Sequence, residues 1–285
     1  MTDIRITLTL FTVVLFMNTV AYYVIVPPGY RKEKSSSNAK GLDKRSFVIE
    51  LLPYVGLVSF VYLLIKSQEI LIRELVNVMG ISLDYGLARD IFLLEGSKVS
   101  IFQAFTSPVL TYVSSFIYIF GFSFLLTFTF IFFLMTDQLE TLKEYTVALS
   151  FIYMVAFPFY IFTPVKVTGY TLPGMTPLLY NLSPLIASGL RTVDPSFDNC
   201  FPSLHAALSI LAMFFILFRT DNNALKVVGV LMTLAIQFTI FYLGIHWITD
   251  FIGGIILALL SYYLATKYHS PIAKKFHHVV WPDKQ

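Results

Sequence analysis

The chain has 285 residues, of which 56% are hydrophobic and only 13% are charged, and its mean hydropathy is +0.74. Soluble domains carry about a quarter charged residues, so this composition excludes an ordinary soluble domain and indicates an integral membrane protein. The net charge is +3. Because no nucleic-acid-binding motif accompanies it, the basic residues are interpreted as topology signals, and no nucleic-acid partner is expected. The single cysteine, Cys200, excludes an intramolecular disulfide.

The first apolar segment, residues 6–26, is long enough to cross about 30 Å of hydrocarbon. A cleaved signal peptide is the alternative, but only Arg5 precedes the segment as a basic residue and no small-residue cleavage site follows it. We therefore expect residues 1–46 to form a retained transmembrane helix followed by a basic loop. The positive-inside rule places that loop in the cytoplasm.

Residues 47–268 contain further apolar segments and are expected to form the six-helix core. The predicted fold class is all-α, a polytopic membrane helix bundle with about seven transmembrane helices in total. The expected core crossings are residues 47–65, 109–135, 145–163, 201–218 and a run over 227–268 that breaks at Gly244 into two helices.

Two segments inside this core differ in composition from the crossings. Residues 67–108 mix charged residues with leucine, isoleucine and valine at roughly helical spacing, which predicts one or two interfacial amphipathic helices. Residues 164–202 are rich in proline and glycine and are expected to form an ordered loop at the active site. The tail, residues 269–285, is basic. Its His277-His278 pair is interpreted as solvated, since no further ligand has the spacing of a metal site.

Charge also predicts the orientation of the bundle. With the N-terminal basic loop inside, seven crossings place the turn at 219–226 and the C-terminal tail in the cytoplasm. The loop at 164–202 then lies on the extracytoplasmic face. Since only one returning helix separates them, the helices that begin near His205 and His246 start at the same face.

The first candidate site segment reads Cys200-Phe-Pro-Ser-Leu-His205 and opens an apolar run. An ionisable residue at a membrane helix is costly and marks a candidate functional site. Pro202 is expected in the first turn of the helix. Ser203 and the free amides of that turn can hydrogen-bond an anion, which the helix dipole also favours.

The second segment contains His246 and Asp250, which are four residues apart and are expected on one helix face. A carboxylate in contact with an imidazole fixes its tautomer and raises its basicity. His246 is then primed as a nucleophile, and His205, near a helix N-terminus, can act as a general acid. This arrangement suits phosphoryl transfer through a phosphohistidine, with no metal and no other cofactor.

Each feature also has a simpler interpretation. A single histidine at a membrane interface is most often a polar side chain that reaches toward water. A His-x-x-x-Asp pair on a helix is commonly a capping or hydrogen-bonding pair. The combination of Pro-Ser ahead of His205 with a topology that brings His205 and His246 to one face favours a functional site over these interpretations.

Phe-Pro-Ser-Leu-His205, followed about forty residues later by His246-x-x-x-Asp250, resembles the second and third motifs of the type 2 phosphatidic acid phosphatase superfamily. The resemblance covers residues 145–268 with specific motifs. It implies a six-helix core with an extracytoplasmic active site. It also implies that His246 attacks phosphorus, that Asp250 supports it, and that His205 protonates the leaving alkoxide.

The closer resemblance is to the inositol phosphorylceramide synthase branch, whose members are inositolphosphotransferases. This branch carries a Phe-Pro-Ser-Leu-His segment and a Tyr-Leu-x-x-His-x-x-x-Asp-x-x-x-Gly segment. The second of these segments is matched here from Tyr242 to Gly254.

Two departures from the superfamily concern arginines that bind phosphate. Where its phosphatases carry Ser-Arg ahead of the second histidine, this chain has Thr239-Ile240. The nearest fit to their first motif is Lys166 with Leu172-Pro173, without the arginine. A monoester carries up to two charges and a diester one, so a less cationic pocket suits a diester donor better.

Lys166, Arg191 and Ser203 are the expected substrate-binding residues. For the two cations an alternative stays open, because either can instead neutralise Asp194 or Asp198, or face lipid headgroups.

Three functions are compatible with these observations. The preferred one is a membrane lipid phosphotransferase that moves a phosphorylated headgroup, such as phosphoinositol, from a phospholipid to an alcohol. The second is a hydrolase of the same superfamily, a lipid phosphate or polyprenyl diphosphate phosphatase with water as acceptor. The third is a transporter, which the position of the polar residues at helix ends disfavours. The expected partners are membrane lipid substrates and the bilayer. The headgroup, the acceptor and the oligomeric state stay open.

Overall fold

The computed structural model of the protein describes residues 2–28, 44–79, 86–192 and 194–280. In this part of the chain the regular structure is helical, without a β-strand, which confirms the predicted all-α fold class. The basic loop expected after the first helix lies largely outside the described residues, as does the end of the tail. The side chains of His277 and His278 also lie outside the description.

Within the described residues, six helical segments are long and apolar enough to cross a membrane. They belong to α1 (Thr2–Ile25), α3 (Lys44–Met79), a continuous rod of α5 (Pro108–Phe116), η2 (Ile117–Gly121) and α6 (Phe122–Met135), α7 (Leu139–Phe162), α12 (Asn223–Tyr242) and α13 (Ile248–Val280). A further apolar helix, α11 (Leu204–Arg219), is shorter and stands at the position of the remaining expected crossing. The predicted polytopic bundle is therefore confirmed.

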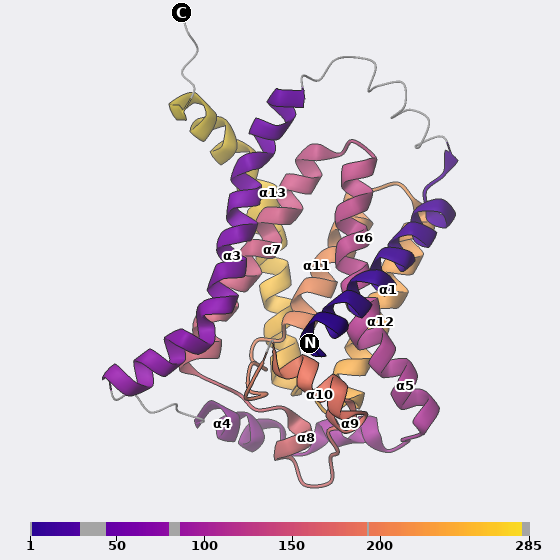
Figure 1. Cartoon of the computed structure of the whole chain (residues 1–285), viewed down its shortest axis with the longest axis vertical. Coiled ribbons are helices and arrows are strands. Elements are labelled where there is room, and N and C mark those ends of the chain that lie inside the picture. Colours follow the sequence, from indigo (N-terminus) through magenta and orange to yellow (C-terminus); the bar gives the residue numbers. More distant parts are fainter. Residues whose placement is uncertain (1, 29–43, 80–85, 193, 281–285) are drawn as a thin grey trace, which may run out of the picture.

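Helix α11 forms the centre of the bundle and packs against α6, α7, α12 and α13 (Figure 1). Its buried positions include both small and large apolar side chains, and Ala206, Ala207 and Leu211 are fully buried. Small residues let helix backbones approach closely in a membrane. The two N-terminal helices pack on the outside of these five helices, α1 against α6 and α3 against α7.

Short helices gather at one end of the bundle, at the bottom of Figure 1. They are α4 (Gly86–Glu95), η1 (Lys98–Gln103), α8 (Thr168–Thr171), α9 (Leu178–Asn181) and α10 (Pro184–Arg191). At this end α12 stops and α13 begins, so the layer of short helices covers the start of α13.

The segment 67–108 differs from its expected form as one or two interfacial helices. Its first part, up to Met79, continues α3 without a break, so α3 is a single helix of 36 residues. Its later part contains the amphipathic helix α4 and the short helix η1. The strong helix formers that continue beyond residue 67 explain why the membrane helix does not end there.

Candidate active site

The loop between α7 and α11 closes on itself before it delivers the chain to α11. Val165 donates a backbone hydrogen bond to Asp198 (2.8 Å) and accepts one from Cys200 (3.2 Å). Next to this pair, the Tyr160 hydroxyl donates to the carbonyl of Pro202 at 2.8 Å. These bonds tie both ends of the loop together and hold the residues just ahead of α11.

Ser203 is the N-cap of α11, and its buried hydroxyl oxygen accepts a hydrogen bond from Ala206 N at 3.2 Å. The expectation that Pro202 stands in the first turn is wrong, because Ser203 takes the capping position and Pro202 precedes it. Leu204 and His205 are therefore the first residues of the helix. Their N–H groups belong to the set that an α-helix leaves without intrahelical acceptors, which makes this helix start suitable for an anion.

A helix-terminating turn places His246 directly ahead of α13. Gly244 adopts a φ of +75°, its N–H donates to Phe241 O at 3.0 Å, and Ile245 N donates to Ile240 O at 3.2 Å. This is the Schellman pattern, in which a residue with positive φ follows the helix. A Cβ at Gly244 would also lie 2.7 Å from Thr176 O. The turn thus requires glycine, and it aims the chain from α12 back toward the bundle.

Asp250 contacts His246 across the turn that leads into α13. Its Oδ2 lies 3.3 Å from His246 Nδ1 and accepts a hydrogen bond from Trp247 N at 3.0 Å. The expectation that the pair shares a face of one helix is therefore wrong, because His246 precedes Ile248, the first residue of α13. The contact exists because Asp250 caps the first turn, as a carboxylate three residues into a helix often does.

The two histidines face one another across α11 and the start of α13. Their ring centroids are 6.0 Å apart and the rings are inclined by 53°. His246 and Asp250 are buried, whereas His205 is partly exposed. Further, Ser203 N donates to Asp250 O at 3.1 Å, which links the two helix starts. The structure therefore brings together His205, His246, Asp250 and Ser203.

Two aromatic side chains that the sequence interpretation missed enclose His205. Tyr118 stacks on it with a centroid distance of 4.2 Å, and Phe122 lies at 4.4 Å. Tyr118 belongs to the π-helical turn η2, a feature that is frequent at functional sites. The third apolar segment is rich in phenylalanine along its whole length, so no sequence signal distinguishes these two positions.

Glu95 at the end of α4 is a second residue that the sequence interpretation missed. Its carboxylate accepts hydrogen bonds from Ile248 N (3.1 Å), Thr249 N (2.9 Å) and Thr249 Oγ1 (3.1 Å). Burial raises the pKa of Glu95, against the opposing effect of these hydrogen bonds. Glu95 therefore caps α13 from another element and fixes the helix start that carries Asp250.

The two cations expected to bind substrate are placed differently from the histidines. Arg191 donates from its guanidinium to Pro195 O at 2.9 Å and lies 4.3 Å from the ring centroid of Phe197, so these contacts are within its own loop. Lys166 has an exposed side chain, and its carbonyl accepts a hydrogen bond from the Trp247 indole at 2.9 Å. The backbone of Lys166 is thus next to the site, while Arg191 is engaged elsewhere.

The carboxylate of Asp194 binds the backbone of its own loop. Asp194 accepts hydrogen bonds from Asp198 N at 3.2 Å and from Asn199 N at 3.1 Å. Burial raises the pKa of Asp194 to about 6. Asn199 in turn accepts a hydrogen bond from Gln68 of α3 at 2.9 Å. The loop is therefore anchored to α3 as well as to its own ends.

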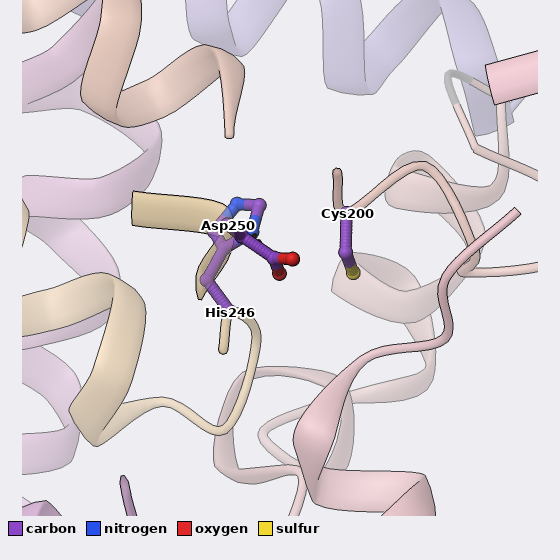
Figure 2. Close-up of side chains that lie close together, drawn as sticks. All are labelled: Cys200, His246 and Asp250. Atoms are coloured by element: carbon purple, nitrogen blue, oxygen red, sulfur yellow. Dashed lines mark hydrogen bonds and ion pairs between the residues drawn. The ribbon is translucent and has the colours of Figure 1, made fainter. Parts of the chain in front are cut away.

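Cys200 lies beside the histidine and aspartate pair, as Figure 2 shows. Its sulfur, a ring nitrogen of His246 and a carboxylate oxygen of Asp250 all lie within 4.8 Å of one another. Burial raises the pKa of the Cys200 thiol well above its usual range. Cysteine, histidine and aspartate are all possible metal ligands, and the sequence spacing of these three does not reveal the cluster.

Comparison with known proteins identifies the family. A family model described as the PAP2 superfamily matches residues 98–264, which is more than half of the chain. The chain belongs to the PAP2 superfamily. The match runs from η1 into α13 and includes both histidines. No curated protein and no solved structure matches the chain. The PAP2 family and the apolar helices together make it an integral membrane protein of a lipid phosphatase and phosphotransferase family.

The family match does not distinguish a branch of the PAP2 superfamily. Thr239 and Ile240 stand where the superfamily's phosphatases carry Ser-Arg ahead of the second histidine. Both residues are fully buried in α12. The carbonyl of Ile240 accepts hydrogen bonds from Ile245 N at 3.2 Å and His246 N at 3.1 Å. This position supports the turn before His246 through its backbone and supplies no cation.

Proposed function

We propose that this PAP2 protein is a membrane lipid phosphotransferase. It moves a phosphorylated headgroup, such as phosphoinositol, from a phospholipid donor to an alcohol acceptor through a phosphohistidine on His246. The observation that carries the proposal is the facing pair of His205 and His246, with ring centroids 6.0 Å apart and Asp250 behind His246. Rings this close can contact one phosphate group together, with His246 about 3–3.5 Å from phosphorus in a near-attack geometry and His205 at the leaving oxygen.

The first half-reaction uses all three residues. His246 donates a hydrogen bond from Nδ1–H to the carboxylate of Asp250, and this tautomer has its lone pair on Nε2. Nε2 attacks the phosphorus of the donor, and the bond from phosphorus to the oxygen of the diacylglycerol breaks. His205 gives a proton to the leaving alkoxide, so diacylglycerol departs as the neutral alcohol. The headgroup stays on His246 as a phosphoramidate.

The second half-reaction reverses these roles. The hydroxyl of the acceptor gives its proton to His205, and its oxygen attacks the phosphorus on His246. The bond from phosphorus to Nε2 breaks, which restores the neutral imidazole. The first N–H groups of α11, beside His205, are suited to hold the non-bridging oxygens in both steps. Tyr118 and Phe122 cover one side of His205 and limit access of water.

The preference for a diester donor is supported by the sparse positive charge at the site. Ile240 stands where PAP2 phosphatases carry an arginine, and Arg191 lies on Phe197 in its own loop. A monoester dianion needs more compensation by charged donors than a diester monoanion does. Lys166 and Ser203 are proposed as substrate-binding residues. Arg191 contacts Pro195 and Phe197 of its own loop, so its binding of substrate requires that loop to rearrange.

We also propose that the site faces the extracytoplasmic side and that the C-terminus is cytoplasmic. The supporting observation is that the histidines lie near the starts of α11 and α13, whereas the end of α11, the start of α12 and the end of α13 are at the other end of the bundle (Figure 1). Arg219 ends α11, and Lys226 lies in the first turn of α12. The positive-inside rule assigns that basic end to the cytoplasm. A C-terminal epitope that is protected from protease in sealed, right-side-out vesicles supports this orientation, and one that is cleaved contradicts it.

The decisive experiment compares headgroup transfer from a diester lipid to an alcohol with phosphate release from a monoester lipid to water. Purified protein is mixed with headgroup-labelled phosphatidylinositol and candidate lipid alcohols, and separately with labelled phosphatidic acid. Headgroup transfer to the alcohol that exceeds phosphate release from the monoester supports the transferase. Faster release of inorganic phosphate contradicts it and favours the hydrolase. His246→Ala is expected to abolish both activities, whereas substrate uptake that persists in this variant would indicate a transporter.

A further inference from the structure

The cluster of Cys200, His246 and Asp250 contains a buried polar atom that the proposed reaction does not use. Asp250 Oδ2 is engaged by His246 and Trp247, but Asp250 Oδ1 is buried and has no hydrogen-bond partner among the described residues. Burying a carboxylate oxygen without a partner is costly. Figure 2 shows the carboxylate directed to the side on which Cys200 lies. The site therefore has unused ligand capacity.

Cys200 is the natural counterpart of this oxygen. Its thiol is 1% exposed, and it makes a hydrogen bond to Ile245 O at 3.5 Å between sulfur and oxygen, in which the thiol is a weak donor. The sulfur, a ring nitrogen of His246 and a carboxylate oxygen of Asp250 lie within 4.8 Å of one another. Three ligand types that bind zinc thus meet in one buried place.

The separations suit a tetrahedral cation. With bonds of about 2.0 Å to nitrogen and oxygen, two ligands of a tetrahedral zinc ion lie about 3.3 Å apart. His246 Nδ1 and Asp250 Oδ2 are 3.3 Å apart, which is longer than a charge-assisted hydrogen bond of about 2.7–2.9 Å. A thiolate with a bond of about 2.3 Å lies about 3.5 Å from the other ligands. Cys200 therefore needs to move by little more than about 1 Å.

The donor set also selects the kind of metal. A thiolate and an imidazole favour zinc over magnesium or calcium, which prefer oxygen ligands. The carboxylate of Asp250 and the thiolate of Cys200 together balance the two positive charges of the ion. Three protein ligands leave the fourth position to a water molecule.

We propose that Cys200, His246 and Asp250 form an inhibitory zinc site inside the phosphotransferase centre. The inhibition rests on the proposed function, whereas the binding itself does not. On binding, the Cys200 thiol releases its proton to solvent, and the proton of the neutral His246 ring moves from Nδ1 to Nε2 by exchange with solvent. Zinc then forms bonds to sulfur, Nδ1 and carboxylate oxygen, while Nε2 carries the ring proton. Zinc on Nδ1 draws electron density from the ring and occupies Asp250, so His246 Nε2 is no longer an effective nucleophile.

The first test needs no lipid substrate. Full-length protein carrying His277→Ala and His278→Ala, so that the tail histidines retain no metal, is depleted with a chelator and titrated with zinc chloride. We expect one equivalent of tightly bound zinc and at least a tenfold loss of affinity in Cys200→Ser. Asp198→Asn removes a buried carboxylate of the neighbouring loop and is the matched control, expected to keep the zinc affinity.

A second measurement does not depend on the folding of a variant. Cobalt bound in place of zinc to the protein with native Cys200 is expected to show a thiolate-to-cobalt charge-transfer band. Absence of this band, or equal zinc affinity with and without Cys200, overturns the metal site.

The inhibition is tested separately from the binding. Zinc is expected to abolish headgroup transfer, a chelator to restore it, and Cys200→Ser to retain basal turnover while needing at least tenfold more zinc for inhibition. Zinc that raises turnover contradicts the inhibition. Cysteine-dependent zinc binding in a protein that turns over no lipid supports the metal site and counts against the proposed function, whereas normal turnover without zinc binding does the reverse.

Discussion

Gly254 of α13 lies directly against Ala206 of α11. A Cβ added at Gly254 would be 2.8 Å from the Cβ of Ala206 and 2.8 Å from Ser203 O. Both contacts are shorter than real Cβ contacts allow, and one of them is to backbone. The two helices that carry the proposed catalytic residues are thus in close contact within about one turn of His205 and Asp250.

Gly254→Ala is therefore expected to push α11 and α13 apart and to separate the two histidines. A misplacement of about 1 Å can cost about a hundredfold in rate, so we expect headgroup transfer to fall at least tenfold. Overpacking of this kind also lowers stability by about 1–3 kcal/mol. Gly56→Ala in α3 is the control, because no atom lies within 4 Å of its added Cβ. Wild-type turnover in Gly254→Ala would show that the helix contact does not set the spacing.

Asp250→Asn tests the supporting carboxylate. The variant keeps one oxygen for the hydrogen bond from Trp247 N (3.0 Å) but cannot hold His246 in the tautomer with its proton on Nδ1. We expect kcat to fall about a hundredfold or more, with little change in KM, in steady-state transfer assays. The exposed Asp221, changed to Asn, is the control and is expected to leave kcat unchanged. If Asp250 had only a structural role, the Asp250→Asn protein would instead be less stable and would retain its kcat per folded molecule.

Glu95→Ala tests the clamp on the start of α13. The variant removes the acceptor of three hydrogen bonds from Ile248 and Thr249, which is worth about 1 kcal/mol per helix cap. Because Glu95 acts only by positioning, kcat is expected to fall severalfold while KM stays constant, and Glu95→Gln to recover part of the loss. Asp90→Ala, an exposed carboxylate on the same helix, is the control. Equal kcat in Glu95→Ala and Asp90→Ala would contradict the role.

Asp194 is expected to make stability depend on pH. Burial raises the pKa of Asp194 from 3.8 to about 6, so between these values the folded chain binds a proton that the unfolded chain releases. The free energy of unfolding therefore falls as pH rises from about 4 to about 6, by roughly 3 kcal/mol at most. Thermal unfolding in detergent across this range measures the slope. Asp194→Asn should flatten it and Asp221→Asn should not. An unchanged slope in Asp194→Asn would refute the assignment.

The proximity of His205 and His246 is predictable from sequence because it depends on the number of helices that separate them. Apolar runs of sufficient length are recognisable, and a single returning helix separates the two that begin with histidines. The break at Gly244 follows from the same reasoning, since glycine can adopt the positive φ of +75° observed there. Helix number and the face on which helices start are thus encoded in composition and order along the chain.

Details at helix ends are less predictable because they depend on which side chain takes the cap. Pro202 is displaced from the helix by the Ser203 cap, and His246 meets Asp250 across a turn instead of along a helix face. Glu95 and Tyr118 act on elements distant from their own in sequence, and only tertiary packing brings them there. Their own segments, an amphipathic helix and a uniformly aromatic span, contain no pattern that singles them out.

The phospho-enzyme on His246 is the most direct test of the proposed reaction. Purified protein is mixed with headgroup-labelled phospholipid in the absence of acceptor, quenched in base, digested and mapped by mass spectrometry. We expect an acid-labile label on His246 that disappears when lipid alcohol is added and is absent from His246→Ala. Label on a different residue, or full headgroup transfer by His246→Ala, would contradict the mechanism.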